Sequence, residues 1–398
     1  MIRYNGATSR DRQARTRAIH AIFRLLLLII AIPAHAGEKP VSKIDYFGDF
    51  RLRLEQDWDA LQGDGSEIDD RLRLRFRLRG GVGIQFSDNW SALVQARSGP
   101  DLSQQSPHIT IHDFDGGPDG PYDFNLEKWY IGYTSGGLTT WAGRNILSSW
   151  HQDDMFIFDN ITYAGAGGSY TQGLDSGSLV WHLNYVALPV GMRDFSGTGL
   201  FAQLVYDQDF GGSGVTLTAG FTGTRANPDD PDGAILLTGN NTRDYSIFNT
   251  QFQYRSSLFD KPLKTGFDYM HNLENYDNET PGSFSEFHKD DIDGYVFELL
   301  WGDTRTAGDW QLGYFYANID ALAINSSYTQ DDWVRWGNAN QVRASNMTGS
   351  EFRMRYTIRP DMNIIVRLFF VDAVDFLEPG DTTKETGNRL RIDWNTSF

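Results

Sequence analysis

The chain has 398 residues, no cysteine, 22% charged residues, a formal net charge of -17 and a mean hydropathy of -0.44. The lack of cysteine excludes disulfides, thiolate metal sites and cysteine nucleophiles, and the acidic balance argues against nucleic-acid binding, which needs a basic face. The low mean hydropathy argues against a membrane protein built from apolar helices.

The first residues have the pattern of a secretory signal peptide. Arginines dominate the start, an apolar run extends over Phe23–Ala34, and a small-x-small triplet ends at Ala36. This order is typical of a cleaved export signal. A membrane-anchoring helix is the weaker alternative, because the apolar run is shorter than the ~20 residues that span a bilayer. We therefore expect a signal peptide at 1–36, cleavage after Ala36, and one domain at 37–398.

Beyond residue 36, polar and apolar residues alternate with a period of two. In Arg71–Arg79, arginine takes every odd position and Leu or Phe every even one. On a strand, the arginines would share one face and the apolar residues the other. The pattern predicts sixteen strands at 45–55, 71–86, 90–98, 126–134, 138–144, 163–171, 179–188, 197–208, 214–224, 244–256, 263–273, 291–302, 310–319, 347–359, 362–372 and 387–398.

The connections between these segments alternate in length. Short turns with Gly, Pro, Asp or Asn alternate with long loops at 56–70, 99–125, 145–162, 189–196, 225–243, 274–290, 320–346 and 373–386. Bacterial outer-membrane barrels sort their connections in this way, with short periplasmic turns and long extracellular loops. We therefore expect an all-β, transmembrane antiparallel β-barrel of about 16 strands in the outer membrane of a Gram-negative bacterium.

Aromatic residues gather toward the predicted strand ends. They suit the interfacial girdles of a barrel, although ordinary strand packing is an alternative for each of them. The set is Trp90, Tyr130, Tyr133, Trp141, Trp181, Tyr185, Tyr295, Trp301, Trp310, Tyr356 and Trp394.

Several segments resemble a known family. Residues 46–56, 69–99 and 126–145 resemble the opening of the porin family of Gram-negative outer-membrane β-barrels and of alginate-export-type barrels. Residues 308–333 and 388–398 are more similar to the porin branch. The resemblance implies a passive channel without cofactors, surrounded by outer-membrane lipid and lipopolysaccharide and assembled by the barrel-assembly machinery.

The alternation predicts an arginine-rich inner wall. The inward-facing arginines come from the first three and last three predicted strands, which become contiguous when the barrel closes, with Arg144 nearby. The predicted pore-lining set is Arg51, Arg53, Arg71, Arg73, Arg75, Arg77, Arg79, Arg97, Arg144, Arg353, Arg355, Arg367, Arg389 and Arg391.

The predicted wall across the lumen carries neutral and acidic groups instead. It includes Thr216, Thr218, Thr222, Asn249, Gln251, Gln253, Asp268 and Glu298. An arginine wall facing these groups would create a transverse field that orients an anionic or dipolar solute.

A structural role for the arginines is an alternative. Carboxylates lie among them in the sequence and could form cross-strand ion pairs without any selectivity. These acids are Asp49, Glu55, Glu127, Glu351 and Asp393.

The long loops carry much of the negative charge. Residues 113–125 are rich in Asp, but they lack the Gly and Glu of a calcium-binding EF-hand loop at the required positions, so we expect no metal there. The loops at 99–125 and 320–346 are the longest, and long loops are usually functional. We therefore expect one of them to fold into the barrel as a constriction.

The C-terminus alternates apolar and polar residues up to Phe398, with Trp394 on the same apolar pattern. The family resemblance implies that Phe398 and Trp394 are recognised during barrel assembly. The eight His residues show no GxSxG, HExxH or metal-binding spacing, so we expect no catalysis.

These observations favour a porin that passes small polar, preferably anionic, solutes through an arginine-lined lumen. Export or uptake of an acidic polysaccharide along the same wall is one alternative. The motif around Gly143-Arg144-Asn145 departs from the pattern of the alginate-type branch. A non-conducting surface scaffold or adhesin is the other alternative.

Overall fold

The computed structural model describes residues 43–101, 106–227, 243–333 and 345–398. The predicted signal peptide and its cleavage after Ala36 lie outside the described residues. No helix in the described ranges is long and apolar enough to cross a membrane.

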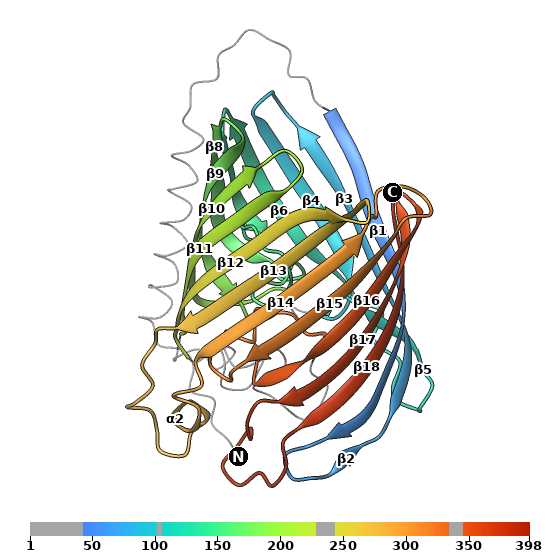
Figure 1. Ribbon diagram of the computed structural model, residues 1–398, viewed down its shortest axis with the longest axis vertical. Coiled ribbons are helices and arrows are strands. Elements are labelled where there is room, and N and C mark those ends of the chain that lie inside the picture. The colour runs from blue at the N-terminus through green and yellow to red at the C-terminus, as the bar shows by residue number, and fades with distance from the viewer. Residues whose placement is uncertain (1–42, 102–105, 228–242, 334–344) are drawn as a thin grey trace, which may run out of the picture. The chain divides into compact units, whose positions relative to one another are not determined.

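The strands form one antiparallel sheet that closes on itself (Figure 1). Closure occurs because β1 pairs with β18 on one side and with β3 on the other. The ring contains β1 (Lys43–Leu61), β3 (Arg71–Gln85), β4 (Trp90–Ser98), β6 (Phe124–Ser135), β7 (Leu138–Asn145), β8 (Tyr163–Leu174), β9 (Gly177–Pro189), β10 (Phe195–Asp209), β11 (Gly214–Arg225), β12 (Tyr245–Leu258), β13 (Lys261–Asn272), β14 (Asp293–Gly302), β15 (Trp310–Ile319), β16 (Met347–Arg359), β17 (Met362–Ala373) and β18 (Thr386–Ser397). The predicted closed barrel of 16 strands is confirmed.

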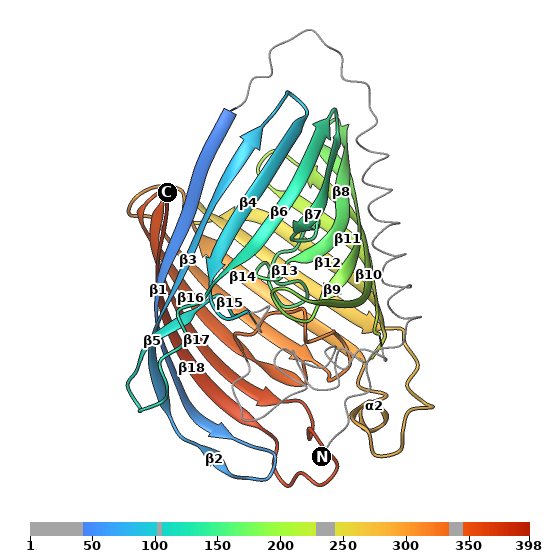
Figure 2. The same ribbon diagram turned by 180° about the vertical axis from the view of Figure 1, so that it is seen from behind.

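Three short elements in the long loops escaped prediction. β2 (Glu67–Ile68) pairs with the end of β1, and β5 (Ile109–Asp113) pairs with β3 beyond the point where β4 ends. α2 (Phe284–Phe287) is a single turn capped by the Ser283 side chain. Figures 1 and 2 show β2 and α2 at the same end of the barrel, opposite to the short turns. They are too short for a periodic pattern to reveal.

Inward and outward faces alternate along the strands as the sequence predicts. On β18, Arg389 and Arg391 are at most 1% exposed, whereas Ile392 between Arg391 and Asp393 is 38% exposed. Aromatic residues on the outer face include Tyr185 at 63% and Trp181 at 39% exposure. These strands therefore present apolar and aromatic side chains outward, and β18 holds its arginines inside.

Trp141 does not belong to the predicted aromatic girdles. It is only 7% exposed and packs in a buried cluster with Leu147 and Phe158 of the loop after β7. Gly143 has a φ of +135°, and this conformation interrupts the alternation. Trp141 and Arg144, three residues apart, are therefore both buried.

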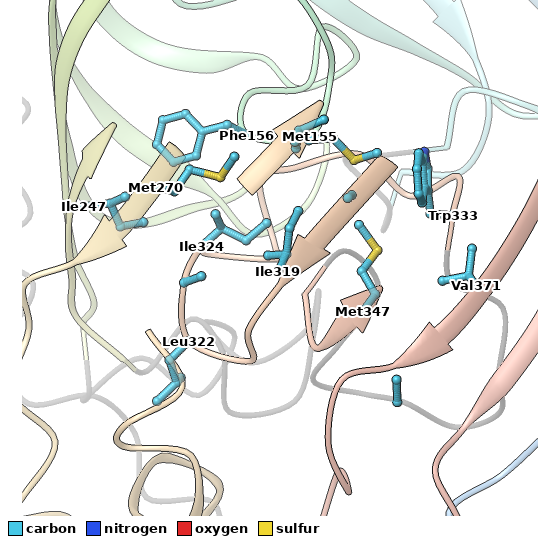
Figure 3. Packing of buried hydrophobic residues seen from close by; sticks show 14 of the residues in the cluster. Met155, Phe156, Ile247, Met270, Ile319, Leu322, Ile324, Trp333, Met347 and Val371 are labelled. Atoms are coloured by element: carbon cyan, nitrogen blue, oxygen red, sulfur yellow. The ribbon is translucent and has the colours of Figure 1, made fainter. Parts of the chain in front are cut away.

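Two loops fold inward and build an apolar core within the long-loop half of the barrel. The segment 145–162 contributes Met155 and Phe156, and the segment 320–333 contributes Leu322, Ile324 and Trp333. Figure 3 shows these residues beside inward-facing residues of the strand ends. Those wall residues include Ile247, Met270, Ile319, Met347 and Val371.

Candidate functional site: the inner wall of the barrel

The arginines align in rows across neighbouring strands. In one row, Arg353 of β16 lies opposite Arg367 of β17, which lies opposite Arg391 of β18. The row continues to Glu55 of β1 and Arg73 of β3. Because β16, β17, β18, β1, β3 and β4 pair in this order, the arginines of both chain ends form one surface, which we call the arginine wall.

Glu55 is the centre of this wall. Its side chain is fully buried, and its carboxylate receives Arg391 Nε at 2.8 Å and Arg75 Nη1 at 3.2 Å. Arg389 lies at 3.6 Å, and Arg73 also donates to the same group. The carboxylate is therefore shared by five guanidinium groups, since Arg53 Nη1 also lies 3.9 Å away. Asp57 and Asp332 offset part of this positive charge, because they pair with the same arginines.

The acids predicted to form a structural ladder do form ion pairs. Arg53 binds Asp393 through two hydrogen bonds of 2.6 and 2.9 Å. Arg79 donates to Glu127 at 2.8 Å. Arg77 of β3 pairs with Asp49 of β1 at 2.5 Å, and Arg367 of β17 pairs with Glu351 of β16 at 2.8 Å. Bidentate pairs such as Arg53–Asp393 hold a guanidinium in one orientation.

Three further acids contact the wall and were not assigned to it from the sequence. Asp57 lies on β1, which extends six residues beyond its predicted end, and accepts from Arg389 at 2.5 Å. Asp113 on β5 accepts from Arg71 at 2.6 Å. Asp332 reaches the wall from the loop after β15 and lies 2.7 Å from Arg367. All three were expected in loops, so period-two patterning did not connect them with the wall.

The arginines outnumber the carboxylates that pair with them among the described residues. The paired carboxylates are Asp49, Glu55, Asp57, Asp113, Glu127, Asp332, Glu351 and Asp393. The arginines of the wall are Arg51, Arg53, Arg71, Arg73, Arg75, Arg77, Arg79, Arg97, Arg353, Arg355, Arg367, Arg389 and Arg391. Shared carboxylates therefore link most of the wall arginines into one network of ion pairs.

Members of the wall differ in accessibility. The side chains of Arg97 and Arg53 are at most 2% exposed, whereas those of Arg73, Arg75 and Arg77 are 11–13% exposed. Side chains in this second group keep part of their surface exposed. Buried members instead hold the wall together.

Arg144 has a separate environment on β7. Its Nε donates to Thr162 at 2.8 Å, a terminal nitrogen donates to the carbonyl of Met192, and the guanidinium lies 5.1 Å from the Phe195 ring centroid. Arg144 thus joins two long-loop segments near the ends of β7 and β10.

The predicted opposite wall is buried and carries different chemistry. Gln251 donates to Asp268 at 2.7 Å, and Gln152 of the loop after β7 donates to the same carboxylate. Glu298 is 2% exposed on the neighbouring strand. The other predicted members, each at most 7% exposed, are Thr216, Thr218, Thr222, Asn249 and Gln253.

The loop at 145–162 folds into the barrel, which the sequence did not reveal. The side-chain amide of Gln203 on β10 binds both the N–H and the carbonyl of Trp150, at 2.8 and 2.7 Å. Asn184 on β9 binds Ser148 in the same manner, at 2.8 and 2.9 Å. A signal for its burial was present in the sequence but was not used, namely the apolar residues Met155, Phe156 and Phe158 within the loop.

One of the two loops expected to fold inward does so. Residues 321–333 are buried, and Gln330 N–H donates to the Asp154 carbonyl at 3.2 Å, so this segment meets the 145–162 loop inside the barrel. The loop at 99–125 instead returns to the sheet as β5. Near this loop, Arg75 donates to Ser106 at 2.9 Å.

One group in the described residues has the spacing of metal ligands. His151, Asp154 and Asp159 each offer a ligand atom within 4.8 Å of the others. His151 Nε2 lies 3.1 Å from Asp159. Burial raises the pKa of Asp154 to about 6, and the charge of Asp159 adds to this effect. The Asp-rich segment 113–125 was considered as a calcium loop from the sequence. In the structure, Asp113 pairs with Arg71, and Asp115 accepts from the Leu72 N–H.

At the C-terminus, main-chain hydrogen bonds join Phe398 to Gly48 at 2.9 and 3.0 Å. Its side chain is 73% exposed. Trp394 packs edge-on against Phe50, with 5.9 Å between the ring centroids.

The feature that this chain shares with known proteins is the closed ring of sixteen strands. The fold is that of the Gram-negative outer-membrane porins. OprB of Pseudomonas putida is similar over 89% of this chain and 94% of its own, with a TM-score of 0.53 and 11% identity. OmpF of Salmonella typhi is similar over 90% and 98%, with a TM-score of 0.50 and 13% identity.

An anion-selective porin from Comamonas acidovorans is also similar, over 90% of this chain and 100% of its own, with a TM-score of 0.50 and 12% identity. No family model matches the sequence, and no curated protein matches it. The likeness therefore lies in the fold.

Proposed function

We propose that this chain is an outer-membrane porin of a Gram-negative bacterium, a passive channel for small polar solutes with a preference for anions. The observation that carries the proposal is the arginine wall, which covers the inner face of six contiguous strands. Its arginines outnumber the carboxylates that pair with them. A locally positive lumen raises the local concentration of anions and lowers that of cations.

The two walls have complementary roles in this proposal. The partly exposed side chains of Arg73, Arg75 and Arg77 attract the anion, and the buried ion pairs keep the wall in place. The opposite wall carries no arginine among its predicted members and contributes Thr, Asn and Gln side chains beside the buried Asp268 and Glu298, so the positive charge lies on one side of the lumen. The attraction depends on charge, so high ionic strength weakens it.

The remaining assignments follow from the same proposal. The segment 1–36 is an export signal cleaved after Ala36. The outer apolar face contacts outer-membrane lipid and lipopolysaccharide. Phe398 and Trp394 form the signal that the barrel-assembly machinery recognises. No cofactor or catalytic residue is assigned.

A non-conducting scaffold is the second candidate, and one observation favours it. The apolar cluster of the 145–162 and 320–333 loops fills part of the long-loop half of the barrel. Single-channel conductance separates the candidates, because a porin gives steady current steps and a permanently plugged barrel gives none.

The arginine wall is tested by replacing Arg73, Arg75 and Arg77 with Gln and measuring the reversal potential in a salt gradient. We expect the anion preference to fall. As a control, Arg305→Gln removes an arginine that is 78% exposed in a short turn and should change nothing. Far-UV circular dichroism checks that the variants retain the barrel. An unchanged reversal potential in a folded triple variant would contradict the proposed role of these arginines in anion preference.

A further inference from the structure

The loop after β15 holds one of its own carboxylates against the arginine wall. Asp332 Oδ2 lies 2.7 Å from Arg367 Nη1, and Oδ1 forms an ion pair with Arg391 Nη1. The main-chain carbonyl of Asp332 accepts from Arg389 Nη1 at 3.1 Å. Three arginines therefore direct the same terminal nitrogen, Nη1, at one residue of the loop.

Acids of the strands hold the Nε atom of each of these arginines, and also Nη2 of Arg367 and Arg389. Arg367 donates from Nε and Nη2 to Glu351 at 2.8 Å each. Arg389 donates from Nε and Nη2 to Asp57, and Arg391 donates from Nε to Glu55. Strand residues thus fix the three guanidinium groups independently of the loop. Their Nη1 atoms form a preorganised site for an oxygen ligand.

We propose that the Nη1 groups of Arg367, Arg389 and Arg391 form a binding subsite for the carboxylate of a small solute, and that Asp332 occupies it as an internal ligand. The inference rests on the proposed function and names the chemical class of the anion. The class follows from the occupant, because the group that fills the site is a carboxylate with a neighbouring carbonyl oxygen. Guanidinium groups bind such planar anions through paired hydrogen bonds.

The internal ligand competes with a solute throughout the ordinary pH range. Burial alone would raise the pKa of Asp332, but the charges of Arg391 and Arg367 outweigh burial and hold this pKa well below its usual value. The carboxylate therefore stays ionised at neutral pH. Next to it, Trp333 is 2% exposed and packs against Phe369, with 5.9 Å between ring centroids. A solute must displace both contacts, which lowers its apparent affinity.

The subsite is tested by measuring benzoate binding to the detergent-solubilised, full-length barrel by saturation-transfer NMR. Asp332→Asn removes the competing charge, so we expect benzoate to bind at least about tenfold more tightly than to the unaltered protein. Asp290→Asn, which neutralises an exposed carboxylate of the 274–290 loop, should leave the affinity unchanged. Benzyl alcohol, which lacks the carboxylate, should show no gain with either variant.

A further substitution assigns the gain to the arginines. In the Asp332→Asn background, Arg367→Gln should abolish the gain in benzoate affinity. If Asp332→Asn does not fold, Asp332→Ser takes its place. Equal benzoate affinity with and without Asp332, or a gain that survives Arg367→Gln, would overturn the proposal. Because binding is measured without current, this failure is distinguishable from failure of the channel function, which conductance reports separately.

Discussion

Glu55 is the residue on which the arginine wall depends most. Its buried carboxylate contacts guanidinium groups from three strands, with Arg391 at 2.8 Å and Arg75 at 3.2 Å. Removing one partner of a buried ion pair leaves the other charge uncompensated, which is strongly destabilising. Replacing Glu55 would therefore remove a carboxylate partner from several arginines at once.

Glu55→Gln should lower the free energy of unfolding by about 3–5 kcal/mol, the range for a broken buried ion pair. Urea unfolding in detergent, followed by tryptophan fluorescence, measures the change. Glu67→Gln, on the exposed position of β2, serves as the control and should stay within about 0.5 kcal/mol of the unaltered protein. If the two variants unfold alike, Glu55 does not organise the wall.

Glu385 gives the 373–386 loop a pH dependence. Burial, together with the charges of Asp381 and Glu378, raises its pKa to about 8. The folded loop therefore binds the proton more tightly than the unfolded loop, so its stability falls as pH rises from the usual Glu pKa toward 8. Hydrogen exchange of this loop, corrected for intrinsic rates, should show weaker protection at pH 9 than at pH 6. In Glu385→Gln the difference should disappear, and its persistence would contradict this origin.

For single residues, the sequence predicted which face of a strand each side chain occupies, but not all of the ion pairs that it forms. Period-two alternation places Arg389 and Arg391 on one face because a strand leaves no other choice. The pairing of Asp57 and Asp332 with these arginines depends on strand extension and loop docking, and neither leaves a periodic signal. The acids within predicted strands, such as Asp393, were found because they share the same alternation.

Among the elements, the loop at 145–162 folds inward and is held by side chains of the barrel strands. Gln203 holds its backbone by binding both main-chain groups of Trp150. Loop length alone favoured 99–125 over this segment. The physical signal that decided otherwise was composition, since Met155, Phe156 and Phe158 would be costly to leave in water.

Gln203→Leu should release this loop, because neither bond to Trp150 can form and a partly buried N–H and carbonyl lose their partners. We expect faster hydrogen exchange in 147–153 and larger or noisier single-channel currents. Gln208→Leu, which affects contacts to Ser176 at a short turn, should leave both measurements unchanged. Unaltered exchange in Gln203→Leu would show that apolar packing alone holds the loop.

For the whole molecule, the number and order of the ring strands followed from alternation and loop lengths, whereas some strand ends did not, such as that of β1. All sixteen strands of the ring were anticipated, and β4, β15 and β16 match their predicted bounds. This success has a physical cause, since a barrel that faces lipid outside and water inside repeats one pattern in every strand. The filling of its interior could not be predicted in this way, because loops dock by individual contacts such as Asp332 with Arg367.

The most direct test of the channel function is the reversal potential of the unaltered protein in a planar bilayer with a KCl gradient. A locally positive lumen predicts steady current steps and a reversal potential with the sign of chloride preference. The preference should weaken as the salt concentration is raised, because screening shortens the reach of the arginine wall. A reversal potential with the sign of potassium preference, or a bilayer without current steps, would contradict the proposed anion-preferring porin.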